Sequence, residues 1–135
     1  MRGPLAITLA LVALLAAGCG VRNSKPFEAK STAGCLAKKG FTGVSTDPAR
    51  VGFIASFAPR GGIKATSPTG NVLTVAFAED ADTVADTVAA FKRLASPFYR
   101  KHISDILETD RNAVLVWSVT PDQDELRDAE FCLRS

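Results

Sequence analysis

Residues 63–78, IKATSPTGNVLTVAFA, contain two short runs of alternating side chains on either side of a turn sequence. In Ile63–Thr66 and Val72–Ala78, apolar residues alternate with small or polar ones, a pattern typical of strands that bury one face. Residues 67–71, Ser-Pro-Thr-Gly-Asn, are of the types that β-turns favour. This stretch therefore predicts a β-hairpin, around which the other elements can be placed.

A further strand is predicted over Ala113–Val119, the clearest strand pattern in the chain. We expect its core face and that of the hairpin to be shared by Leu73, Val75, Phe77, Leu115, Trp117 and Val119. The opposite face would carry small, mildly apolar residues, namely Thr74, Ala76, Ala78, Val114, Val116 and Ser118. That face is expected to be thinly covered or to be a contact surface, with Thr74, Ala76, Val114 and Val116 as its candidate residues. If this face is covered, the segment with Phe53, Ile54 and Phe57 is a candidate to pack on it.

Other segments predict helices and one more strand. They are a helix over Phe27–Lys39, a strand over Phe41–Ser45, a short helix or packed loop over Ala49–Ala58, a long helix from Asp80 or Asp82, a second helical segment from Pro97 to Leu107, and a final helix after Thr120. The long helix carries an apolar stripe of Val84, Val88, Phe91, Ala95 and Phe98. The order α-β-(α)-β-β-α-β-α predicts an α+β fold with a four-stranded, mostly antiparallel sheet and packed helices.

Local signals mark where several of these helices begin and end. Gly40 suits the position after the first helix, and Asp47-Pro48 is typical of an N-cap followed by proline in the first turn. Thr120-Pro121-Asp122-Gln123 has the pattern of a capping box for the final helix. Ser96-Pro97 predicts the end of one helix and the start of another, and Asp110-Arg111-Asn112 predicts a turn.

The N-terminus has the pattern of an export signal. One arginine, Arg2, precedes an apolar run over residues 5–15, which ends in small residues before Cys19. This run is too short to span a membrane, which takes about 20 apolar residues. The sequence Leu15-Ala16-Ala17-Gly18-Cys19 resembles the lipobox of bacterial lipoproteins, although Ala16 stands where leucine is usual. The alternative is an ordinary signal peptide that is cleaved at the same bond.

The lipobox resemblance implies that Cys19 carries a lipid and becomes the first residue of the mature protein. We therefore expect a signal peptide over residues 1–18, a lipid-anchored tether over 19–30 and a single domain over 31–135. The protein would be exported and anchored to the outer face of the bacterial cell membrane. The domain also resembles small exported bacterial domains that have no characterised activity.

The three cysteines fit this interpretation, because lipidation of Cys19 leaves Cys35 and Cys132 as an even pair. An oxidising compartment favours a disulfide between them, which would join the first and last helices. The alternative is two separate buried thiols. Neither cysteine has a second Cys or His at metal-ligand spacing, so no metal site is expected.

Charge is unevenly distributed along the chain. Residues 19–64 contain eight Lys and Arg against two acidic residues, whereas residues 65–135 contain seven against twelve. The near balance of the whole argues against nucleic-acid binding. Because basic residues can contact anionic lipid, we hypothesise that the basic end faces the membrane; the alternative is a solvated charged face.

The sequence contains few candidate catalytic residues. The only histidine is His102, and Asp105 could share its face, but no local serine completes a triad. Residues 60–62, Arg-Gly-Gly, lack phosphate-loop spacing and indicate a break before a strand. The acids Glu79, Asp80 and Asp82 suit a helix N-terminus, and Trp117 suits the core better than a ligand site.

The sequence thus predicts a non-enzymatic binding or interaction module of the cell envelope. No cofactor is expected; the partners would be the membrane, through Cys19, and an envelope protein. The alternative is a small hydrolase or small-molecule-binding accessory protein that uses His102.

Overall fold

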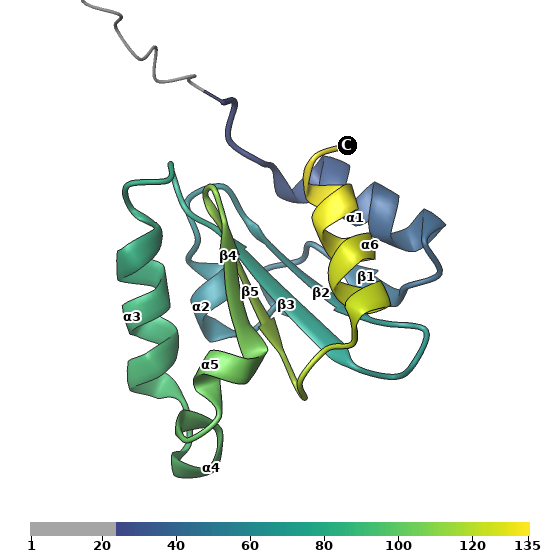
Figure 1. Ribbon diagram of the computed structural model, residues 1–135. Helices are drawn as coiled ribbons and strands as arrows, with labels where there is room; N and C mark the ends of the chain where they lie inside the picture. The colour runs from purple at the N-terminus through teal and green to yellow at the C-terminus, as the bar shows by residue number, and fades with distance from the viewer. Residues whose placement is uncertain (1–23) are drawn as a thin grey trace, which may run out of the picture.

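In the computed structural model, which describes residues 24–135, a five-stranded antiparallel sheet lies between two groups of helices (Figure 1). The strands are β1 (Thr42–Ser45), β2 (Gly62–Thr66), β3 (Val72–Phe77), β4 (Leu107–Asp110) and β5 (Ala113–Trp117), in the order β1-β2-β3-β5-β4. The helices are α1 (Ala29–Lys38), α2 (Phe53–Ser56), α3 (Val84–Leu94), α4 (Pro97–Arg100), α5 (Ile103–Ile106) and α6 (Gln123–Leu133). The predicted α+β class and the predominance of antiparallel pairing are confirmed.

The main core lies between the sheet and the pair α1–α6. Leu73, Val75, Phe77, Leu115 and Trp117 project to this face as predicted, and all are buried. The Cys35–Cys132 disulfide joins α1 to α6, as expected, with an S–S distance of 2.02 Å. Val119 is an exception to the predicted core. It lies two residues beyond the end of β5 and is 60% exposed.

The prediction of four strands was wrong, because residues 107–110 form β4 rather than the end of a helix. β4 pairs with β5 through the turn Arg111–Asn112, where Arg111 has a φ of 50°. Pairing with the open edge of β5 satisfies backbone groups that one helical turn would leave to solvent. The predicted helical segment from Pro97 to Leu107 is accordingly divided into α4 and α5.

Two predicted helix starts also differ from the structure. Asp47-Pro48 begins a turn, in which Asp47 Oδ1 accepts a hydrogen bond from Ala49 N, and α2 begins only at Phe53. The capping box of α6 is formed by Asp122 and Glu125, whose side chains each accept from the other's backbone N–H. The N-cap of α6 is therefore Asp122 and not Thr120, although Thr120 also has a capping-type residue, Gln123, three positions on.

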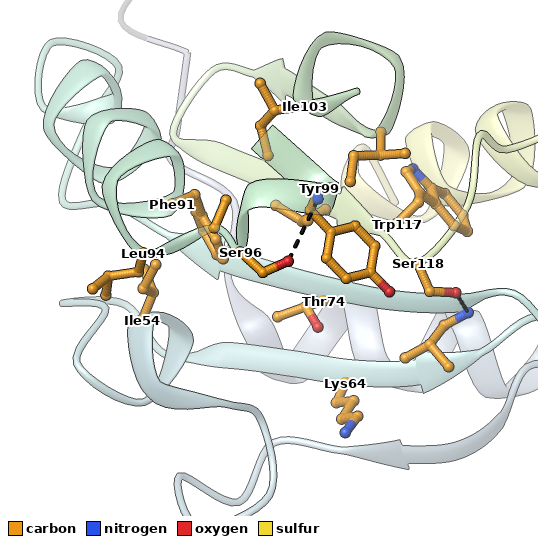
Figure 2. A pocket seen from close by; sticks show the side chains of 14 residues that line it. Ile54, Lys64, Thr74, Phe91, Leu94, Ser96, Tyr99, Ile103, Trp117 and Ser118 are labelled. Carbon is orange, nitrogen blue, oxygen red and sulfur yellow. Dashed lines mark hydrogen bonds between the residues drawn. The ribbon is translucent and has the colours of Figure 1, made fainter. Parts of the chain in front are cut away.

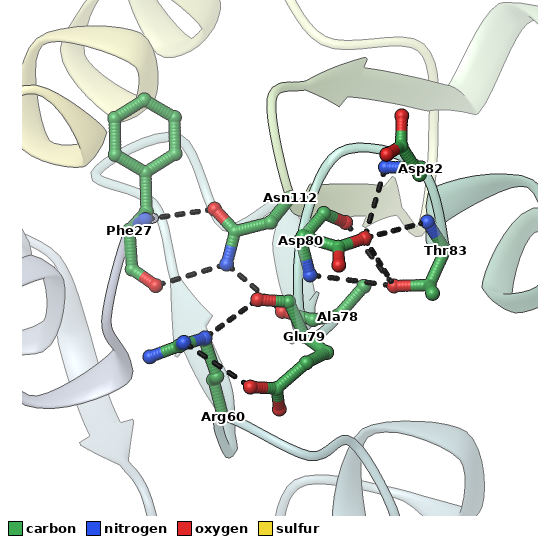
Figure 3. A network of polar contacts seen from close by, with 8 residues as sticks. All are labelled: Phe27, Arg60, Ala78, Glu79, Asp80, Asp82, Thr83 and Asn112. Atoms are coloured by element: carbon green, nitrogen blue, oxygen red, sulfur yellow. Dashed lines mark hydrogen bonds and ion pairs between the residues drawn. The ribbon is translucent and has the colours of Figure 1, made fainter. Parts of the chain in front are cut away.

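A buried amide joins the start of the domain to the sheet (Figure 3). The Asn112 side chain accepts a hydrogen bond from Phe27 N and donates to the carbonyls of Phe27 and Ala78. Phe27 itself is buried, so the chain is held against the body of the domain from this residue onward. Of the predicted tether over 19–30, residues 19–23 lie outside the described residues. Residues 27–30 belong to the folded domain, because Phe27 is buried and α1 begins at Ala29.

Candidate functional site

The second face of the sheet carries an open groove at the end of α3 (Figure 2). Its cavity volume is about 350 Å³, within the range of small-molecule sites. The lining is mostly apolar and consists of Ile54, Lys64, Val72, Thr74, Phe91, Leu94, Ala95, Ser96, Tyr99, Ile103, Ile106, Val116, Trp117 and Ser118. The groove is therefore built by the sheet, α2, the end of α3, and the α4–α5 segment.

Three neighbouring strands place the floor of the groove. Lys64 of β2 pairs with Thr74 of β3, and Thr74 pairs with Val116 of β5, so the three side chains lie in a row on one face. Thr74 and Val116 were two of the predicted surface residues, and both are partly exposed at the floor. The other two, Ala76 and Val114, are fully buried and so form no part of a surface.

The helices α2 and α3 cover only one end of this sheet face. The end with Ala76 and Val114 is covered, whereas the end with Thr74 and Val116 is open. Ala76 packs against Val51 and Ala55, on and just before α2, and Val114 packs against Val84 of α3. The expected cover of Phe53, Ile54 and Phe57 is realised differently. Only Ile54 reaches the groove, whereas the two phenylalanines are largely exposed and stack edge to face with centroids 5.1 Å apart. A four-residue helix turns only one side to the sheet, and Ala55 occupies it.

The remaining wall depends on the predicted break at Ser96-Pro97. The Ser96 hydroxyl accepts a hydrogen bond from Tyr99 N at 3.5 Å and caps α4, whose first residue is Pro97. This sharp turn brings the Tyr99 ring over the groove (Figure 2). No sequence pattern indicated that Tyr99 would line a site, because its position depends on how α3 packs on the sheet.

The groove has one charged residue among those that line it. Lys64 is exposed at its edge, and the lining contains no carboxylate within residues 24–135. Ser118 is engaged elsewhere, because its hydroxyl donates to Asn71 Oδ1 at 2.8 Å and accepts from Val72 N. The arrangement suits an apolar group that lies on Thr74 and Val116 beside a negatively charged group at Lys64.

His102 lies outside this lining. Its side chain is 62% exposed, and its Nδ1 is 3.8 Å from Asp105. Ser104 contacts Asp105 at 3.5 Å, and no described hydroxyl group hydrogen-bonds to the imidazole. Within residues 24–135, no group of three or more His, Cys, Asp or Glu is placed to hold a metal ion.

The other motifs have structural roles (Figure 3). Arg60 Nε donates to the carbonyl of Glu79 at 2.7 Å, and its guanidinium pairs with the Glu79 carboxylate at 3.2 Å. Asp80 closes a turn by accepting from the backbone N–H groups of Asp82 and Thr83, so α3 begins at Val84 and not at either aspartate. Trp117 is buried in the core, as its strand position indicated.

Cys19 and the lipobox-like sequence lie outside the described residues. Within residues 24–135, the helices are all too short or too polar to cross a membrane. No family model, curated protein or solved structure matches the chain.

Proposed function

We propose that this protein is an exported, lipid-anchored binding module of the bacterial cell envelope, and that the groove holds its ligand. The groove is the observation that carries the proposal, because it combines an apolar floor with a single cation at its edge. The lipobox-like sequence supports the anchor, and the disulfide is typical of proteins that mature in an oxidising compartment. The exposed position of His102 gives no support to a hydrolase.

The ligand class follows from the lining. Thr74, Val116 and Tyr99 offer contact to an apolar ring or a short alkyl segment, and Lys64 offers a partner for an anionic group. We therefore propose a small amphiphile with a negative charge. Anilinonaphthalenesulfonate, an aromatic anion, and phenylnaphthylamine, its uncharged counterpart, are suitable fluorescent probes.

Two substitutions test the groove. Thr74→Phe fills the floor and should abolish binding of both probes, whereas Lys64→Gln should weaken only the anionic probe. Lys30→Gln, at an exposed lysine of α1, is the matched control and should bind both probes normally. Near-ultraviolet circular dichroism of Trp117 verifies that each variant is folded. Unchanged binding in folded Thr74→Phe and Lys64→Gln would refute the groove as the ligand site.

The anchor is tested separately by the intact mass of protein recovered from bacterial membranes. We expect a diacylglyceryl adduct on Cys19, and we expect Cys19→Ser to abolish it. A mature protein with an unmodified N-terminal Cys19 would contradict the anchor and leave the groove proposal standing.

A further inference from the structure

A second surface lies next to the groove, where α3 ends and α4 begins. We call it the α3–α4 corner and define it by three apolar residues, Leu94, Phe98 and Tyr99, and four cations, Lys92, Arg93, Arg100 and Lys101. Phe98 is 72% exposed, Leu94 61% and Tyr99 42%. Phe98 was expected to complete the buried stripe of α3, but the break at Pro97 turns it outward. Large apolar side chains gathered at one exposed place indicate an interaction surface.

The charge of the corner is strongly positive. The four cations lie within residues 92–101, and the nearest acidic residues in sequence are Asp86 and Asp105. None of the four forms an ion pair within residues 24–135, and Arg100 makes only a hydrogen bond to the carbonyl of Ala95 at 3.1 Å. The positive charge of the corner is not apparent from the sequence totals, because residues 65–135 as a whole contain more acidic than basic residues.

We propose that the α3–α4 corner docks on an anionic lipid bilayer. The cations complement lipid headgroups, and Leu94, Phe98 and Tyr99 can enter the interface between headgroups and acyl chains. A second copy of the chain fits less well, because a symmetric dimer would place these cations opposite the same cations. The basic surface near α1 is also less suitable, because acidic side chains lie among its lysines: Lys39 is paired with Asp128 at 3.1 Å, and Glu28 lines the same hollow as Lys30 and Lys38.

The location of the corner gives the contact a role beyond the anchor. α4 lies at the opposite end of α3 from the place where the N-terminal segment enters the domain (Figure 1). Docking there would be a second membrane contact. Since Leu94 and Tyr99 also line the groove, it would bring the groove to the lipid surface.

Vesicle sedimentation of residues 24–135 tests the proposal without the anchor, since this fragment keeps the main core, which runs from Phe27 to Leu133, and the Cys35–Cys132 disulfide. Near-ultraviolet circular dichroism confirms its fold. We expect binding to mixed phosphatidylcholine–phosphatidylglycerol vesicles, loss of most binding with phosphatidylcholine alone, and weaker binding at high salt. Lys101→Ala should lower the partition coefficient about fivefold, as expected for one cation at an anionic surface. Phe98→Ala should lower it about tenfold through loss of apolar burial.

Matched controls lie at the other end of the molecule. Lys38→Ala removes an exposed cation of α1, and Phe131→Ala removes an exposed aromatic of α6. Both should bind like the parent fragment. The proposal is overturned if the folded fragment binds neither vesicle, if it binds both equally, or if Lys38→Ala weakens binding and Lys101→Ala does not. A dimer that Phe98→Ala dissociates, without vesicle binding, would assign the corner to a second copy.

Discussion

The hydroxyl of Ser67, in the turn between β2 and β3, donates a hydrogen bond to the carboxylate of Glu125 in the first turn of α6, 58 residues later. The same carboxylate accepts from Thr69, from the Asn71 amide and from the backbone of Asp122. Asn71 in turn contacts the end of β5 through its hydrogen bonds with Ser118 and Val119. One buried carboxylate therefore fixes the hairpin turn, the end of β5 and the start of the last helix.

Removing this acceptor should destabilise the domain. In Glu125→Gln the side chain keeps its shape, but one of its two acceptor oxygens becomes an amide N–H₂, which can no longer accept from either the Asn71 and Asp122 N–H groups or the hydroxyls of Ser67 and Thr69. We expect a loss of about 1–3 kcal/mol in the free energy of unfolding, measured with urea. Glu130→Gln, on the exposed side of the same helix, is the control and should change little. Equal stability of the two variants would contradict the role of Glu125.

Glu125 should also make stability depend on pH. Burial raises the pKa of its carboxyl, but the hydrogen bonds from Ser67, Thr69, the Asp122 backbone and Asn71 outweigh burial and hold the pKa below its ordinary value of 4.5. The group therefore stabilises the fold above its unfolded pKa, and this contribution is lost as pH falls through the folded pKa. The melting temperature should decline in acid, and the decline should be shallower in Glu125→Gln. If the melting temperatures of the parent and of Glu125→Gln declined equally in acid, the pKa of Glu125 would not be the cause.

Reduction of the disulfide should cost more than any of the point substitutions. Cys35 and Cys132 are separated by 97 residues, so the bridge restricts nearly the whole unfolded domain. The chain-entropy model gives a loss of about 4–5 kcal/mol for a loop of this length. The measurement is urea unfolding with and without reductant, and Cys35→Ala/Cys132→Ala should reproduce the reduced value and be insensitive to reductant. A difference below about 1 kcal/mol would mean that α1 and α6 hold together without the bridge.

Local patterns were sufficient for the hairpin and the strand β5, because alternation and turn residues are properties of the sequence itself. The cysteine pair followed from the sequence once Cys19, in the lipobox-like segment, was set aside from the three cysteines. Ser96-Pro97 likewise fixed the break after α3. β4 was missed because four residues contain too little pattern, and their strand form depends on the free edge of β5.

The groove could not have been predicted for a related reason. Whether Thr74 is open and Ala76 closed depends on where α2 and α3 end above the sheet, which the strand sequence does not contain. The exposure of Phe53 and Phe57 is equally a matter of which side of a single helical turn meets β3. Apolar composition alone predicted a cover where the structure has an exposed pair.

Substitution of His102 distinguishes the binding module from the hydrolase, and we expect it to have no effect on binding. Its exposed ring lies near Asp105, with Nδ1 3.8 Å from the carboxylate, and near the Phe98 ring, whose centroid is 6.1 Å away. We expect His102→Ala to leave probe binding in the groove unchanged. Hydrolysis of a generic ester by the purified protein that His102→Ala abolishes would instead support the enzymatic alternative.

A close approach between α2 and β2 links the packing of the domain to the groove. A Cβ on Gly62 would lie 2.6 Å from Ala55 Cβ and 2.7 Å from the Ala55 carbonyl oxygen, so Gly62→Ala must displace the backbone of α2. We expect a loss of about 1–3 kcal/mol in unfolding free energy, together with weaker probe binding, because Ile54 of the same helix lines the groove. Gly34→Ala has no atom within 4 Å of its added Cβ and lies inside α1. It should therefore stabilise the domain by up to about 1 kcal/mol and leave probe binding intact. If both substitutions shifted stability in the same direction, the contact between α2 and β2 would not be the cause.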